Sequence, residues 1–168
     1  TVTNVQGCTA TDQVTVTVTN ATLGVSIAAG PLAVCPGSSL QLTAAPIGGT
    51  GLYSFTWSAD GVEFSTEQNP VFSPSVSTLF TVVVSDGQTS ASASRSVDVY
   101  PATMANAGAD QNIQIGTTAL LTASGGNQYV WNTGASDPSI EVRPLSDMHY
   151  TVTVTDEHGC TGTDEVNV

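Results

Sequence analysis

The chain has almost no positive charge. Among its 168 residues 14 are acidic, Lys is absent, and Arg95 and Arg143 are the two basic residues, so the formal net charge is −12. Nucleic acids and anionic membrane surfaces are recognised mainly through Lys and Arg. We therefore expect neither as a partner. An acidic surface of this kind favours solubility and loose attraction of divalent cations.

Long apolar runs and catalytic motifs are also missing. No run approaches the roughly 18 apolar residues of a membrane-spanning helix, so we expect no membrane insertion. His149 and His158 are the two histidines, and the sequence contains no GxSxG, no HExxH and no Cys/His cluster at zinc spacing. We therefore expect no catalytic residues and no enzyme activity.

What the chain does have is alternation of Thr or Ser with Val. Residues 15–19, 81–85 and 151–155 place Val on one face and hydroxyls on the other. Alternation of β-branched residues with period two is typical of half-buried antiparallel strands. With no convincing amphipathic helix, the sequence predicts an all-β fold.

The same stretch occurs at both ends of the chain. An offset of 152 residues aligns residues 1–16 with residues 153–168 and pairs Cys8 with Cys160, and ten of the sixteen positions are then identical. Such a period indicates that these residues are a window on a longer tandem array.

A weaker repeat lies inside this period. Residues 38–44 (SSLQLTA) resemble 117–123 (TTALLTA), and the segments at 72–82 and 142–152 also correspond. We therefore predict Ig-like domains at residues 22–100 and 102–168, while residues 1–20 form the terminal hairpin of a preceding domain. The linkers at Asn20-Ala21 and Tyr100-Pro101 are very short, which limits bending between neighbours.

Each predicted domain reads as a β-sandwich. About seven short strands separated by Gly, Pro, Asn and Asp turns, with a Trp on the third, are typical of an immunoglobulin-like sandwich. The expected core residues are Trp57, Trp131, Phe80 and Tyr150.

Two segments carry a family resemblance. Residues 107–136 (AGADQNIQIGTTALLTASGGNQYVWNTGAS) and 150–168 (YTVTVTDEHGCTGTDEVNV) resemble the PKD/Ig-like tandem repeats of Bacteroidota extracellular proteins. Repeats of that family occur in adhesins, gliding-associated proteins and type IX-secreted enzymes. The resemblance implies an extracellular or cell-surface location and a role as spacer, stalk or fibre.

The cysteines predict a bond between domains. Cys35 lies in the turn after the first strand of its domain, and Cys160 lies in the last hairpin of the next domain. These loops face each other across the 22–100/102–168 junction, so we expect Cys35 and Cys160 to form a disulfide in an oxidising compartment. Cys8 would pair likewise with a cysteine outside residues 1–168. The alternative is unpaired or interchain thiols.

No cofactor is expected, although calcium is one possibility. Asp156, Glu157 and Asp164 flank one hairpin, Asp12 is the copy of Asp164, and oxygen ligands of this type suit Ca²⁺. The alternative is that these carboxylates accept backbone hydrogen bonds beside turns. Asn20-Ala21-Thr22 matches a glycosylation sequon.

The resulting hypothesis is a structural repeat segment of a long fibre or adhesin stalk, whose partners are neighbouring copies of itself and surface glycans. One alternative is an accessory carbohydrate-binding or spacer module of a secreted enzyme. Another is a filament subunit in which residues 1–20 add a strand or hairpin to a neighbouring subunit.

Overall fold

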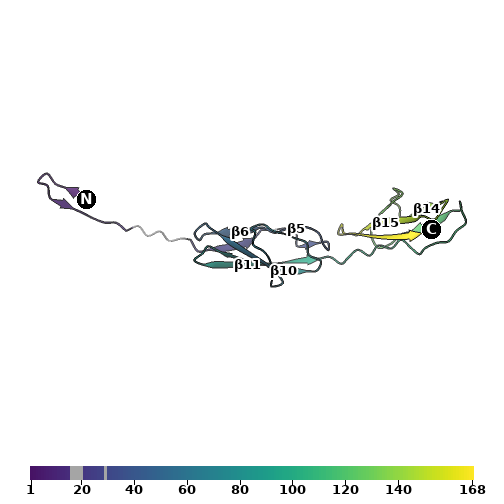
Figure 1. The fold of residues 1–168 in the computed structure, drawn as a ribbon, viewed down its shortest axis with the longest axis horizontal. Helices are drawn as coiled ribbons and strands as arrows, with labels where there is room; N and C mark the ends of the chain where they lie inside the picture. The colour runs from purple at the N-terminus through teal and green to yellow at the C-terminus, as the bar shows by residue number, and fades with distance from the viewer. Residues whose placement is uncertain (16–20, 29) are drawn as a thin grey trace.

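The structure, a computed structural model, describes residues 1–15, 21–28 and 30–168. Within these residues it contains strands and turns and no helix, so the all-β prediction is confirmed. An N-terminal hairpin is followed by two immunoglobulin-like β-sandwiches, and the two sandwiches follow one another along the long axis (Figure 1).

The first sandwich has a five-stranded sheet in the order β4-β11-β10-β7-β8, faced by the pairs β3-β6 and β5-β9. Most of its strands are short because Gly, Pro, Asn and Asp turns interrupt the chain. The bounds are β3 Gly24–Ile27, β4 Ala33–Val34, β5 Leu40–Gln41, β6 Ala44–Ile47, β7 Ser54–Ala59, β8 Val62–Ser65, β9 Val71–Phe72, β10 Thr78–Ser85 and β11 Ser90–Val99.

Strand β10 shows how the Thr/Val alternation builds this core. Its residues Phe80, Val82 and Val84 are fully buried, while the residues between them point toward solvent or the sheet surface. Trp57 on β7 is also fully buried, opposite Val82 in the sheet. The period-two pattern therefore places one face of the long strands against the core.

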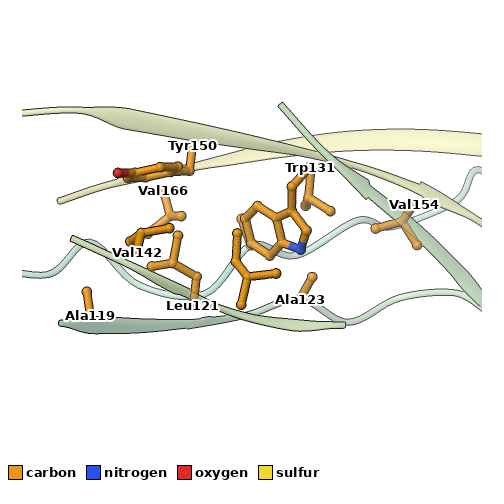
Figure 2. Packing of buried hydrophobic residues seen from close by; sticks show 11 residues of the cluster. Ala119, Leu121, Ala123, Trp131, Val142, Tyr150, Val154 and Val166 are labelled. Carbon is orange, nitrogen blue, oxygen red and sulfur yellow. The ribbon is translucent and has the colours of Figure 1, made fainter. Parts of the chain in front are cut away.

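The second sandwich has a three-stranded sheet in the order β13-β15-β16 and a facing pair β12-β14. Trp131, Val152, Val154 and Val166 are at most 1% exposed and form one core cluster with Leu121 of the facing pair. Figure 2 shows part of this cluster, with Trp131 and Val166 on one side and Leu121 on the other. Tyr150 closes one end of this core at 7% exposure. The bounds are β12 Ala119–Thr122, β13 Gln128–Trp131, β14 Ser139–Val142, β15 His149–Thr155 and β16 Thr161–Asn167.

The number of strands differs from the expected seven per domain. Among the described residues, the first sandwich has nine strands and the second sandwich has five. In the second sandwich, the first strand is reduced to a bridge between Asn106 and Ser124 and a hydrogen bond from Gln111 N to Asn167 O. Gly108, at φ 90°, lies between these contacts and turns the chain from one sheet toward the other.

The two sandwiches share the turn that enters their second strand. In the first sandwich Gly37 N donates to Pro74 O at 2.7 Å, and in the second Gly116 N donates to Pro144 O at 3.2 Å. The sequence similarity that aligns residues 38–44 with 117–123 therefore corresponds to equivalent backbone bonds. In this alignment Gln114 occupies the position of Cys35.

The N-terminal hairpin is formed by β1 (Val2–Thr3) and β2 (Thr9–Ala10). The segment 15–19, expected to be a strand, lies outside the described residues except for Thr15, and Asn20 also lies outside them.

Candidate functional site: the junction between the sandwiches

The position of Cys35 follows from the pairing of β4. This short strand runs parallel to the end of β11, with Val34 opposite Val99, and Tyr100 N donates to Val34 O at 3.0 Å. Cys35 is the next residue after β4, and Tyr100 is the last residue before the linker. The pairing therefore places Cys35 at the end of the first sandwich from which the chain leaves.

Cys160 lies at the facing end of the second sandwich. It ends the tight turn between β15 and β16, in which Asp156 N donates to Cys160 O at 2.9 Å and Gly159 adopts a φ of 81°. A positive φ of this size is readily adopted by glycine. The turn extends back toward the first sandwich.

A disulfide joins Cys35 to Cys160 across the junction. The two Cα atoms are 5.4 Å apart, and the bond closes a loop with a sequence separation of 125 residues. This Cα separation is usual for a disulfide. The pairing is the one expected from the sequence, and it links two separate hydrophobic cores covalently.

Asp156 ties the same turn to the linker. Its Oδ1 accepts hydrogen bonds from His158 N and Cys160 N at 2.8 and 2.9 Å, and its Oδ2 accepts one from Thr103 Oγ1 at 2.8 Å. The hydrogen bond from Thr103, together with those from the turn, holds the pKa of Asp156 below its ordinary value. The charged carboxylate thus positions both the turn that carries Cys160 and the linker residue Thr103.

An aromatic stack crosses the junction beside the disulfide. The rings of Tyr100 and His158 lie face to face, with centroids 3.9 Å apart and an interplanar angle of 6°. His158 Nε2 also lies 3.6 Å from Glu157 Oε1, at a largely exposed position. The stack fixes the last residue of the first sandwich against the hairpin of the second.

The linker passes very close to β16. A Cβ atom added to Gly162 would lie 2.3 Å from the backbone oxygen of Thr103, well inside van der Waals contact. Any larger residue at position 162 would therefore displace either the linker or the strand. Glycine here allows the linker to pack directly on the second sandwich.

The candidate calcium ligands are not gathered into one site. Asp164 Oδ2 accepts a hydrogen bond from Ala107 N at 2.8 Å, and Asp156 is bonded as described above. Glu157 is exposed beside His158. In the described part of the chain, no group of three or more His, Cys, Asp or Glu side chains is placed to hold a metal ion. Asp156 and Asp164 act here as acceptors for neighbouring backbone and hydroxyl groups.

The remaining candidates lie away from the junction. Cys8 is an exposed free thiol in the N-terminal hairpin, and Asp12 Oδ1 accepts a hydrogen bond from the neighbouring Gln13 N. His149 begins β15 and is exposed. The portion of the chain that the structure describes contains no helix that could span a membrane.

Sequence reasoning placed Tyr100 at the linker, but it predicted no contact across the junction for Tyr100, Thr103 or His158. One signal was present, because Tyr100 directly precedes the linker and His158 is two residues from Cys160. Once those two cysteines are paired, residues beside them must lie close to the same interface.

The comparisons with known proteins bear on the fold. No protein-family model matches the chain, and no curated protein matches it. Among solved structures, the N-terminal eight Ig domains of Down Syndrome Cell Adhesion Molecule isoform 1.30.30 align over 88% of this chain with a TM-score of 0.57 and 14% identity. The chain spans 23% of that structure. Domains 1–5 of Sidekick-1 align over 84% of this chain and 38% of their own, with 13% identity and a TM-score of 0.41. The first alignment supports an immunoglobulin-like fold.

Proposed function

We propose that this chain is a load-bearing structural segment of a long extracellular or cell-surface fibre or stalk built from tandem Ig-like domains, with no catalytic role. The observation that carries the proposal is the Cys35–Cys160 disulfide, which joins two consecutive sandwiches rather than stabilising one of them. A covalent bond in this position serves the connection between domains.

The other contacts at the junction act in the same direction. The Tyr100–His158 stack, the Thr103–Asp156 hydrogen bond and the close approach of the linker to Gly162 all restrain the angle between the sandwiches. Domains that share only a small interface are expected to move relative to one another. Here the linker, the stack and the disulfide form three separate connections, which suits a stiff spacer.

The disulfide also determines the path of a pulling force. A force applied at the two ends of the chain enters the first sandwich through β3 and β4, reaches Cys35, and crosses directly to Cys160. It then leaves through β16. Residues 36–159, which include most strands of both sandwiches, lie inside the covalent loop and carry no extension while the bond is intact.

The length protected in this way is large. The loop separation of 125 residues corresponds to about 400 Å of extended chain, at about 3.3–3.6 Å per residue. We expect a folded pair of sandwiches to add about 70–80 Å to the length of a fibre. The bond therefore prevents an extension several times the folded length.

An extracellular or cell-surface location is supported by this bond, since disulfides persist in oxidising compartments. We propose neighbouring copies of the repeat as the main partners along the fibre. Surface glycans are a further proposed partner for the assembled fibre, for which hydroxyl-rich strand faces such as Thr81 and Ser94, hydrogen-bonded side by side at 2.8 Å, are candidates.

The arrangement of aromatic residues favours the structural role over a carbohydrate-binding module. All ten Phe, Trp and Tyr residues lie in the described part of the chain, and each is buried or half-buried. Phe64, Phe72 and Phe80 pack against each other edge to face, with centroids 4.8–6.2 Å apart. Stacking on sugar rings requires exposed aromatic faces, and these side chains are used in packing instead.

Small-angle X-ray scattering tests the stiff-spacer proposal. The oxidised chain should give one narrow distribution of distances for the pair of sandwiches, and Cys35→Ser with Cys160→Ser should broaden it. Cys8→Ser serves as the matched control, because that thiol is free and exposed. Equal flexibility of the oxidised chain and the double variant would contradict the proposal.

A further inference from the structure

The N-terminal hairpin has the geometry of the hairpin that completes the second sandwich. In β1 and β2, Val2 is opposite Ala10 and Thr3 is opposite Thr9. In β15 and β16, the residues at the same offset have the same register, with Val154 opposite Gly162 and Thr155 opposite Thr161.

The two turns also have the same hydrogen bonds. Asn4 N donates to Cys8 O at 2.9 Å, and Asn4 Oδ1 accepts hydrogen bonds from Gln6 N and Cys8 N. Asp156 makes the equivalent bonds with His158 and Cys160. Gly7 has a φ of 83° where Gly159 has 81°. The first fifteen residues thus adopt the shape of the final hairpin of the second sandwich.

The apolar side chains of this hairpin are exposed where those of the complete copy are buried. Val2 and Val14 are 75% and 88% exposed, whereas their counterparts Val154 and Val166 are fully buried. Val5 is 98% exposed, and its counterpart Glu157 is exposed as well. The pattern therefore separates a face that is buried in the complete copy from one that faces solvent there.

The complete copy also shows which residues contact the equivalent hairpin. Val154 is opposite Tyr129 of β13, and Asp164, the counterpart of Asp12, accepts a hydrogen bond from Ala107 N. Cys160, the counterpart of Cys8, is bonded to Cys35 of the sandwich before it. The paired strand and the contact with Asp164 come from the same sandwich as the hairpin, and the thiol partner comes from the sandwich before it.

We infer that the hairpin of residues 1–15 docks onto a further copy of the second sandwich, supplied as a segment equivalent to residues 102–152. We further infer that Cys8 forms a disulfide with the cysteine that stands in the position of Cys35 in the sandwich before that copy. The two thiols lose two protons and two electrons, and an oxidant of the glutathione disulfide class accepts them and becomes two thiols. This interface deepens the proposed function by naming the partner that continues the fibre.

One residue of the hairpin departs from its counterpart. Ala10 stands where Gly162 does, and a Cβ at Gly162 would lie 2.3 Å from the backbone oxygen of Thr103. In the docked hairpin, the residue equivalent to Thr103 must therefore lie farther from the strand. The test therefore includes the variant Ala10→Gly, which removes this Cβ atom.

The test extends the full chain by the missing part. Residues 22–152 are joined directly to Thr1 of the 168-residue chain, because Thr1 corresponds to Thr153. Ser38→Thr in the added copy marks its Cys35 peptide by mass, since Thr117 is tolerated at the corresponding position of the second sandwich. The extended chain is prepared with Ala10 and with Ala10→Gly, and is oxidised with glutathione disulfide.

Peptide mapping without reduction and amide hydrogen exchange are the two readouts. We expect a peptide that joins Cys8 to the marked Cys35, and exchange in residues 1–15 that is slower by about 100-fold or more than in the 168-residue chain. Val14→Asp should abolish this protection, while the matched control Val5→Asp should leave it unchanged. A free Cys8 and rapid exchange in both versions would overturn the inference.

Association between separate chains is the remaining outcome. Sedimentation of the 168-residue chain with Cys8→Ser should show a monomer. Concentration-dependent oligomers with a protected hairpin would replace the docking proposed here by strand addition between chains, and so would overturn it. In either case a retained Cys35–Cys160 bond leaves the proposed load-bearing function standing, so the two proposals fail separately.

Discussion

Tyr100 and His158 stack face to face at a centroid distance of 3.9 Å, although one belongs to the end of the first sandwich and the other to a hairpin of the second. The stack lies beside the Cys35–Cys160 bond. It therefore adds a second, non-covalent contact between the two sandwiches beside the covalent one.

Removal of the stack should loosen the junction without unfolding either sandwich. Aromatic pairs contribute about 0.5–1.5 kcal/mol beyond buried area, so Tyr100→Ala should have its largest effect when Cys35 and Cys160 are both Ser. NMR should show that the His158 ring protons lose their ring-current shift. Tyr53→Phe serves as a control, because it removes a hydroxyl far from the junction. An unchanged His158 shift in Tyr100→Ala would contradict the stack.

The two central tryptophans should respond differently to the same substitution. Trp131 Nε1 donates to Asp137 O at 3.1 Å, whereas the buried Trp57 Nε1 has no acceptor among the described residues. Replacement of Trp131 by Phe leaves a cavity and an unpaired carbonyl, and should cost about 2–4 kcal/mol. Replacement of Trp57 also removes an unpaired donor, and this gain offsets part of the free-energy cost of the cavity. Trp57→Phe should therefore lower the free energy of unfolding by less than Trp131→Phe. Thermal unfolding of the two variants measures the difference, and equal losses would contradict this account.

The acid stability of the second sandwich should depend on Asp156. Its pKa is lowered, first by the hydrogen bond from Thr103. A lowered pKa means that the carboxylate stabilises the fold above about pH 4, and that this stabilisation is lost as the pH falls through the lowered pKa.

Asp156→Asn should therefore flatten the dependence of melting temperature on pH below about pH 4. Asn4 holds the equivalent turn in the N-terminal hairpin, so the variant should keep the turn itself. Replacement of the exposed Asp147 by Asn is the matched control. If Asp156→Asn retains the full acid transition of the parent chain, other carboxylates are responsible.

The sequence allowed the β class and the cysteine pairing to be predicted because both depend on local pattern and topology. Thr/Val alternation places Phe80 and Val82 in the core regardless of what surrounds the domain. Cys35 and Cys160 could be paired because loops at facing ends of consecutive sandwiches must meet.

The rest of the junction could not be predicted in this way. The stack of Tyr100 on His158 and the bond from Thr103 to Asp156 depend on the path of the linker. That path is determined by contacts between domains, which have no periodicity in the sequence. Asp156 was considered as a calcium ligand because its hydrogen-bond donors could not be identified from the sequence. In the structure it accepts three hydrogen bonds from nearby groups. The sequence did not predict that the first strand of the second sandwich is divided at Gly108, because a single glycine does not reveal which sheet each half of the strand joins.

The measurement that tests the central claim most directly is pulling of single molecules of the 168-residue chain from its two termini. With the disulfide intact, unfolding should release only the short segments outside the loop. After reduction, or in Cys35→Ser with Cys160→Ser, the same pull should release about 400 Å more, as the loop separation of 125 residues requires. Release of the full length from the oxidised chain would show that the bond does not carry the load, and would contradict the account.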